Sequence, residues 1–271
     1  MSVSSVYDYL MIDLADPVTR NWALVETPFP IIIITFAYLY FVLYAGPSYM
    51  KNRQSFNLRI FILFYNVFQI LANAWLVHSY VSAGWFTKYS IKCSNNNDLT
   101  STNGSKLIII SWCVLVLKLI DYIETCVFVL RKKQNQITTL HLYHHMSTVF
   151  TGWYFLKYIV EPRLTFVCLI NCFIHVIMYI YYFIAAYSTT MQQKVSGFKP
   201  YVTKLQMTQF VALIYYGLQA FLDPECKVPQ RAEAFLFVFL LNMLLFLYLF
   251  YDFHKKTYGT KQKQKTAKHE E

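Results

Sequence analysis

Long apolar runs separated by short polar breaks dominate this chain of 271 residues. A helix needs about 20 mostly apolar residues to cross the hydrocarbon core of a bilayer. Runs of about this length lie at 28–46, 60–84, 107–130, 137–158, 164–187, 205–222 and 232–252. The pattern predicts an all-α integral membrane protein with seven transmembrane helices over residues 28–252. An N-terminal segment, 1–27, precedes this domain, and a basic tail, 253–271, follows it.

The composition agrees with a membrane protein and excludes several soluble classes. Apolar residue types make up 56% of the chain and charged types 14%, whereas soluble domains carry about 25% charged residues. A cytosolic enzyme, a secreted disulfide scaffold and a nucleic-acid-binding domain are therefore excluded, despite the net charge of +10. The N-terminal segment is acidic and lacks an apolar core, so we do not interpret it as a cleavable signal peptide.

Basic residues set the predicted orientation, because cytosolic loops of membrane proteins carry an excess of Lys and Arg. The breaks near 51–59, 131–133 and 194–204, together with the tail, hold about twice as many Lys and Arg as the opposite side. This distribution places the tail in the cytosol and the N-terminal segment in the lumen.

Two features of the predicted lumenal loops agree with this orientation. Asn103-Gly104-Ser105 is an N-glycosylation acceptor in the loop 85–106, although such triplets also arise by chance. Cys93 and Cys226 lie in the two longer lumenal loops, where the environment is oxidising, so we predict a disulfide between them. The other four cysteines fall within spans, where we expect them to pack as small apolar residues.

Three histidines share one face of the fourth predicted helix. His141, His144 and His145 have the spacing i, i+3, i+4, which places their side chains on one side of a helix. A single buried histidine is usually a hydrogen-bonded core residue. Ionisable groups inside a membrane are costly, however, and mark functional sites by default. We therefore interpret this face as a candidate site.

Three further spans carry polar side chains at a similar depth. These side chains are Lys118, Asp121, Glu124 and Thr125 in the third span, Asn171, His175, Met178, Tyr179 and Tyr182 in the fifth, and Thr203, Gln206 and Gln209 in the sixth. With a rise of about 1.5 Å per residue, Asp121, His144, His175 and Gln209 lie roughly 6 to 15 Å from the predicted cytosolic side. The alternative is that the charges and amides only join helices. The common layer favours an active site, or the midplane site of a transporter.

The histidines suggest either a metal site or covalent catalysis. The chain has seven histidines in all. Two lie in the tail and His78 is isolated, which leaves too few for a di-iron centre, so we predict no metal. Without a metal, imidazole acts as a nucleophile or a general base. Its attack on a thioester would give a reactive acyl-imidazole, and a deep apolar pocket beside it would suit a long acyl chain.

At these residues the sequence resembles the ELO (ELOVL) family of very-long-chain fatty acid elongases, over nearly the whole chain. Lys118-Leu-Ile-Asp121-Tyr-Ile-Glu124-Thr125 is similar to the family motif K-x-x-E-x-x-D-T with the two acids interchanged. His141-x-x-His144-His145 is similar to the family's histidine box. The motifs Asn171-x-x-x-His175-x-x-Met178-Tyr179-x-Tyr181-Tyr182 and Thr203-x-x-Gln206-x-x-Gln209 follow in the same order. The loop Ser196–Val202 departs from the Trp- and Lys-rich stretch that is usual there.

The resemblance implies a fold and an activity. Six of the seven helices would form an inverted barrel around an acyl tunnel closed at its lumenal end. The activity would be the condensation of a long-chain acyl-CoA with malonyl-CoA to a 3-oxoacyl-CoA two carbons longer, with release of CoA and CO2. His144 would form the acyl-imidazole, His141 and His145 would activate it, and His175 and Asn171 would stabilise the enolate. The supporting residues would be Lys118, Asp121, Glu124, Tyr179, Tyr182, Gln206 and Gln209.

Because CoA carries phosphates, the entrance through which it binds should be cytosolic and lined by basic residues. The candidates are Arg131, Lys132, Lys199, Lys204 and Lys255, although the topology rule explains the same residues equally well. We expect the endoplasmic reticulum membrane as the location and no resident cofactor. The expected partners are acyl-CoA, malonyl-CoA, membrane lipid, the other enzymes of the elongation cycle and a further copy of the chain. A seven-span receptor or transporter and a metal-dependent desaturase or hydroxylase remain the alternatives.

Overall fold

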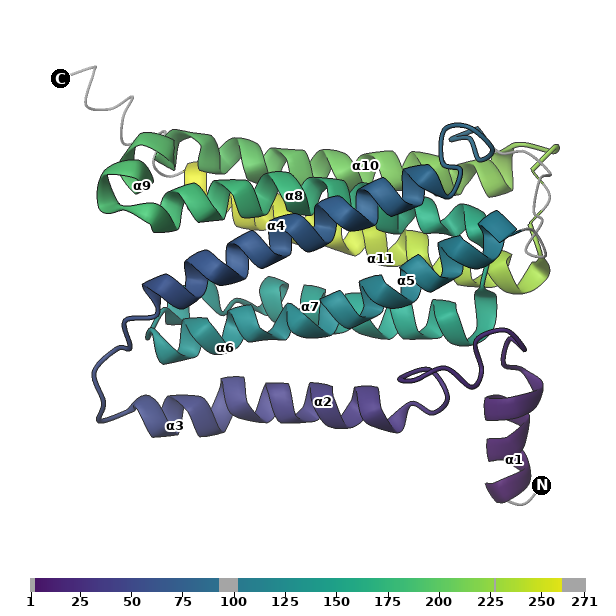
Figure 1. Ribbon diagram of the computed structural model, residues 1–271, viewed down its shortest axis with the longest axis horizontal. Helices are drawn as coiled ribbons and strands as arrows, with labels where there is room; N and C mark the ends of the chain where they lie inside the picture. The colour runs from purple at the N-terminus through teal and green to yellow at the C-terminus, as the bar shows by residue number, and fades with distance from the viewer. Residues whose placement is uncertain (1–2, 93–101, 227, 260–271) are drawn as a thin grey trace.

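The computed structural model describes residues 3–92, 102–226 and 228–259, and the regular secondary structure in these ranges is helical, apart from one isolated bridge between Trp85 and Tyr89. Figure 1 shows long helices lying side by side in one bundle. The N-terminal helix α1 (Val3–Asp8) stands apart at one end of it, and α9 (Thr189–Val195) lies at the other. We call these the α1 end and the α9 end.

Seven long helical segments of the described residues follow the seven predicted runs. They are α2 (Phe29–Tyr40) with α3 (Gly46–Met50), α4 (Arg59–Ser82), α5 (Thr102–Ile120) with α6 (Tyr122–Leu130), α7 (Thr139–Tyr154), α8 (Thr165–Tyr187), α10 (Lys199–Leu222) and α11 (Gln230–His254). A π-helical turn, Phe41–Ala45, joins α2 to α3, and another, Phe155–Ile159, extends α7. The all-α prediction is confirmed for the described residues.

Four helical stretches of the described chain are long and apolar enough to cross a membrane: Phe29–Met50, Arg59–Ser82, Pro162–Tyr187 and Gln230–Tyr258. The segments α5–α6, α7 and α10 occupy predicted spans but carry many of the charged, imidazole and amide side chains of the candidate site. The protein is thus a multi-pass membrane protein. The seven-span inverted barrel stays a prediction, because the polar site lowers the hydropathy of the helices that would complete it.

Two helix boundaries differ from the predicted ones. Helix α10 begins at Lys199 rather than at residue 205, because Pro200 occupies its first turn, where a missing backbone N–H costs nothing. Helix α5 begins at Thr102 rather than at 107, so Asn103 lies in its first turn and not in a loop. The apolar run alone could not reveal these polar first turns.

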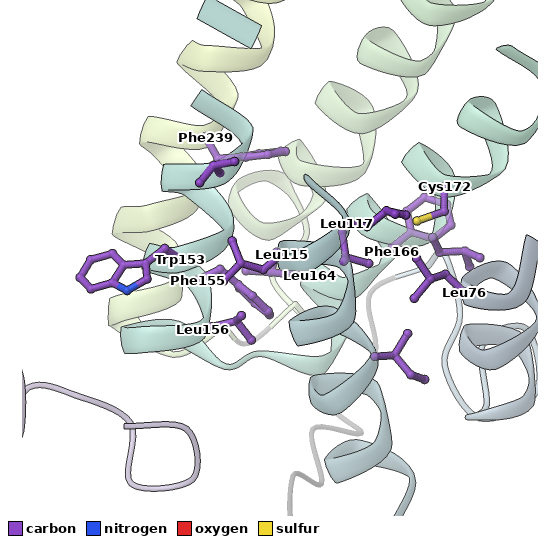
Figure 2. Packing of buried hydrophobic residues seen from close by; sticks show 14 of the residues in the cluster. Leu76, Leu115, Leu117, Trp153, Phe155, Leu156, Leu164, Phe166, Cys172 and Phe239 are labelled. Carbon is purple, nitrogen blue, oxygen red and sulfur yellow. The ribbon is translucent and has the colours of Figure 1, made fainter. Parts of the chain in front are cut away.

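The interior of the bundle is a continuous apolar core between the helices. Figure 2 shows Leu115, Phe155 and Leu164 converging from different segments, with Leu76 and Phe166 in another part of the same cluster. Helices α2 and α3 lie along one edge of the bundle (Figure 1). The core therefore lies mainly among the helices from α4 onward.

Polar groups close the α1 end. Lys157 is fully buried, and its Nζ donates to the carbonyl oxygen of Glu26 at 2.8 Å and of Arg20 at 3.4 Å. The N–H of Asp16 donates to the carbonyl oxygen of Lys157 at 2.8 Å, and the Trp112 indole donates to that of Ala23 at 2.8 Å. The N-terminal segment is therefore packed onto the ends of α5 and α7.

The described cysteines agree with the predicted division between cysteines within spans and cysteines in the lumenal loops. Cys113, Cys126, Cys168 and Cys172, all within helices, are free. Cys226 is disulfide-bonded. Cys93 lies outside the described residues, so its pairing with Cys226 stays a prediction.

Candidate active site

The histidine face of α7 begins with a local capping interaction. Thr138 precedes the helix, and its hydroxyl oxygen accepts a hydrogen bond from the N–H of His141 at 3.2 Å, which satisfies one of the free donors of the first turn. The ring centroids of His141 and His145 are 4.3 Å apart, and those of His144 and His145 are 5.7 Å apart. The three imidazoles thus lie on one face, as the spacing predicts.

A charged cluster lies where α5 ends and α6 begins. Lys118 Nζ lies 3.2 Å from Asp121 Oδ2, and both side chains are buried. Gln69 Nε2, from α4, donates to Asp121 Oδ1 at 2.8 Å, and the Tyr179 hydroxyl, from α8, lies 3.4 Å from the same oxygen. The carboxylate is therefore held by three helices, which is what a buried charge requires.

The charged cluster connects α5 to the second histidine helix. Lys118 Nζ lies 3.4 Å from Nδ1 and 3.5 Å from Nε2 of His175, which is buried on α8. The rings of His175 and Tyr179 are 5.7 Å apart. His175 is thereby positioned by the ammonium group that also binds Asp121.

A second chain of hydrogen bonds reaches the histidine face. The Tyr38 hydroxyl donates to Thr125 Oγ1 at 3.0 Å, and Thr125 Oγ1 lies 2.8 Å from His141 Nε2. Thr125 is fully buried. This chain fixes the ring orientation of His141 from α2 and α6.

A cavity lies between the two histidine helices, α7 and α8. His144, Lys118, Asn171 and Gln209 contribute polar groups to its wall, and most of the remaining lining is aliphatic or aromatic. The empty space of the cavity is about 910 Å³, including the part that is open to the surroundings. Of the four histidines of the candidate site, His144 lines this cavity.

One polar atom of the cavity wall has no hydrogen-bond partner among the described residues. Asn171 lines the cavity, and its Oδ1 is buried and unpaired there. A buried polar atom without a partner is costly unless a ligand or water satisfies it. Asn171 is therefore the side chain of the lining best placed to meet a polar group of a bound molecule.

The remaining predicted residues are more loosely connected to the cavity. Gln206 Nε2 lies 3.4 Å from the sulfur of Met178, and the ring of Tyr182 is 5.9 Å from that of Tyr179. Glu124 is half-buried one turn after Asp121. These side chains lie around the charged cluster, whereas Gln209 lines the cavity. In the described residues, no group of three or more His, Cys, Asp or Glu side chains is arranged to hold a metal ion.

Sequence reasoning did not assign Gln69 and Asn242 to the site. Gln69 binds Asp121, and it is buried on α4 together with Asn66 and Asn73. Their spacing of i, i+3 and i+7 in an otherwise apolar run was the available signal. Asn242 of α11 lines the cavity and bonds to α7, but a single amide in a span gives no such pattern.

The predicted CoA-binding residues lie at or near the α9 end. Arg131 follows α6, Lys199 and Lys204 lie in the first turns of α10, and Lys255 follows α11. Arg131 is half-buried, and Lys132, Lys199, Lys204 and Lys255 are exposed. The bundle thus brings together basic groups that are distant in sequence, on the side that the sequence assigns to the cytosol.

Sequence comparison now adds to this geometry. The sequence model of the ELO family, described as the GNS1/SUR4 family, matches residues 23–266. The chain belongs to the ELO family.

Similar proteins of this family carry the name very long chain fatty acid elongase. One from Aedes aegypti is 33% identical over 98% of this chain and 73% of its own length. Elongase 7 of Rattus norvegicus is 34% identical over 92% of this chain and 88% of its own. Elongase 4 of Homo sapiens is 33% identical over 94% and 79%, respectively. Family membership therefore extends over the whole helical bundle.

Proposed function

We propose that this ELO family protein is a condensing enzyme of fatty acid elongation, a very-long-chain 3-oxoacyl-CoA synthase. It would convert a long-chain acyl-CoA, malonyl-CoA and a proton into a 3-oxoacyl-CoA two carbons longer, CoA and CO2. The observation that carries the proposal is the position of His144 in the wall of a mainly apolar cavity. The names of the similar proteins support the same reaction class.

In the first step, an imidazole nitrogen of His144 attacks the thioester carbonyl of the acyl-CoA. The carbon–sulfur bond breaks, an acyl-imidazole forms, and the proton lost from the ring leaves with CoA as its thiol. His145 lies beside His144, and His141 lies beside His145. These two rings, with Thr125 bound to His141, orient the nucleophile and offer a path for its proton.

In the second step, malonyl-CoA loses CO2, and the resulting enolate attacks the acyl carbonyl. The carbon–nitrogen bond to His144 breaks, and the ring recovers a proton. His175, held by Lys118, and Asn171, through the Nδ2 donor of its side chain in the cavity wall, are the groups assigned to the developing negative charge. Fixed donors in a site without bulk water stabilise such charge strongly. Departure of CO2 makes the new carbon–carbon bond effectively irreversible.

The apolar part of the cavity is assigned to the acyl chain. Each methylene group transferred from water to an apolar site contributes about 0.8 kcal/mol. Phe155, Leu164 and Phe239 are among the side chains that would contact it. The basic residues at the α9 end would bind the CoA phosphates from the cytosol. Under this proposal the α1 end would lie in the lumen of the endoplasmic reticulum, and α5–α6, α7 and α10 would complete a seven-span bundle.

The proposal is tested with purified protein in lipid nanodiscs, supplied with stearoyl-CoA and malonyl-CoA labelled at its free carboxyl. We expect labelled CO2 and a 3-oxo product in the absence of added metal and NADPH. Malonyl-CoA left intact, with stearoyl-CoA unchanged, would contradict the proposal. A transporter or receptor would consume neither substrate, and a desaturase or hydroxylase would need a reductant and oxygen.

A further inference from the structure

A second hollow lies between α7 and α11, beside the main cavity. Thr151, Phe235, Phe239 and Asn242 line both spaces. These four side chains form a wall that the outer hollow shares with the cavity lined by His144. We call the outer hollow the α7–α11 groove.

The α7–α11 groove faces the region that lipid would occupy. Val238, Leu241 and Leu245 line it, with 64%, 53% and 41% of their surface exposed. All three lie in the middle of α11, within a stretch that is apolar enough to cross a membrane. Exposed aliphatic side chains at this depth contact acyl chains of the bilayer and not water.

A small hydrogen-bonded group joins α7 to α11 along the groove. The Tyr143 hydroxyl donates to Asn242 Oδ1 at 2.7 Å, and Asn242 Nδ2 donates to Ser147 Oγ at 2.9 Å. We call these three residues the latch. The rings of Tyr143 and His144 both lie against Phe246, with centroid distances of 5.4 and 5.2 Å, so the latch and His144 share a neighbour on α11.

The location of a long acyl chain before the reaction decides how it reaches the cavity. The equilibrium constant for moving a chain from hydrocarbon into water falls about fourfold for each methylene. Over sixteen methylenes this constant falls by more than roughly 10⁹-fold. Each interhelical hydrogen bond in a membrane changes the equilibrium constant for helix association by about threefold. The equilibrium constant for breaking the two bonds of the latch is therefore lowered by a factor of only about ten. Sideways passage between two helices is therefore far less costly than passage through water from the α9 end.

We propose that the α7–α11 groove is a lateral binding site for the acyl chain of a membrane-held acyl-CoA, and that the latch opens to pass the chain into the main cavity. The CoA group stays at the α9 end while the chain moves sideways out of the bilayer. This proposal rests on the proposed function, because it concerns the same substrate and the same cavity.

Cross-linking the latch tests the proposal in a single turnover. In the double variant Ser147→Cys/Asn242→Cys, a short bis-methanethiosulfonate joins α7 to α11 through two disulfide bonds, and mass spectrometry counts the cross-linked fraction. When the link is made before stearoyl-CoA is added, we expect acyl-enzyme formation to slow by at least about tenfold, since the latch can no longer open. When the link is made after acylation, added malonyl-CoA should still give one equivalent of 3-oxo product, measured after denaturation.

The controls separate this proposal from the proposed function. Each single-cysteine variant receives the same reagent, and a reducing agent cleaves the link in the double variant and should restore acylation. Acylation of the pre-linked protein at the rate of the single-cysteine controls would overturn lateral access. Absence of acyl-enzyme and product in the untreated wild-type protein would instead overturn the proposed function.

A second pair of variants leaves the latch intact. Val238→Trp fills the α7–α11 groove, whereas Leu244→Trp places the same ring on α11 at an exposed position outside it. We expect Val238→Trp to raise KM for stearoyl-CoA several-fold with little change in kcat, and Leu244→Trp to leave both unchanged. Equal KM values for the two variants would contradict the proposal.

Discussion

Two regions of this protein bury charged side chains, and they differ in what surrounds the charges. At the α1 end, Lys157 is enclosed by backbone carbonyl groups, and Glu161 pairs with Arg163 at 3.3 Å. In the layer of the candidate site, Lys118 and Asp121 also form a buried pair. Lys118, however, additionally lines a cavity and lies next to His175.

The comparison teaches that a buried charge alone does not mark an active site. All of these side chains are buried to a similar extent. Lys157 uses its donors to join the N-terminal segment to the turn after α7, and Glu161 and Arg163 pair with each other. Lys118, in contrast, also lines the cavity, where a substrate can contact it. Variants in the two regions should therefore separate effects on activity from effects on folding.

The largest effect is expected for His144→Ala. Loss of the nucleophile should lower kcat by about 10²–10⁴-fold or more, as for loss of a positioned catalytic side chain. Intact-mass measurement after incubation with acyl-CoA alone should show no covalent adduct. His78→Ala, which changes an exposed histidine of α4, is the matched control and should retain both the kcat and the acyl adduct of the wild-type protein. A persisting acyl adduct in His144→Ala would refute the assignment of the nucleophile.

The next effect is expected for Asp121→Asn, which keeps the shape of the side chain and removes its charge. Lys118 would then be a buried charge without its partner, which typically costs about 3–5 kcal/mol of stability. Displacement of Lys118 should also misplace His175. We expect lower thermal stability together with lower kcat. Normal kcat in the folded fraction would show that Asp121 belongs with the structural charges.

A smaller effect, confined to stability, is expected for Lys157→Met. The carbonyl oxygens of Glu26 and Arg20 would lose their donor, at about 1–3 kcal/mol for each buried group left unsatisfied. Thermal unfolding in nanodiscs should occur at lower temperature, while kcat of the folded protein stays near that of wild type. Lys92→Met, at an exposed lysine, is the control. A loss of kcat as large as that of His144→Ala, without loss of stability, would break the distinction between the two regions.

The smallest effect is expected for the double exchange Asp121→Glu/Glu124→Asp, which restores the family order of the two acids. Each single exchange changes a packed carboxylate by one methylene, which usually costs about 1–3 kcal/mol when a group is enlarged. Since neighbouring substitutions couple, the double variant should be more stable and more active than Asp121→Glu alone. Additive effects in a double-mutant cycle would indicate that the two acids act independently.

The sequence predicted the helices well because their signal is local. Helical spacing placed His141, His144 and His145 on one face, and their ring distances confirm it. Spacing also placed Lys118 within reach of Asp121. Boundaries were less accurate where polar residues form the first turn, as at Lys199 and Thr102, because an apolar run does not extend over them.

Contacts between helices could not be obtained in this way. The bond from Gln69 to Asp121 and the approach of Lys118 to His175 depend on how α4, α5 and α8 are rotated against one another. No periodicity within one helix encodes that rotation. The same limit applies to Asn242, whose role appears only when α11 lies against α7.

By itself, the sequence determined the all-α class, the approximate positions of the long helices, the family resemblance and a layer of polar groups, because each follows from residue type and spacing along the chain. Only the tertiary structure decided that His144 is the histidine of the site that lines the cavity, that Lys157 is enclosed by backbone groups, and that a groove adjoins the cavity. These features are spaces and contacts between helices, and they exist only once packing has fixed how each helix faces its neighbours.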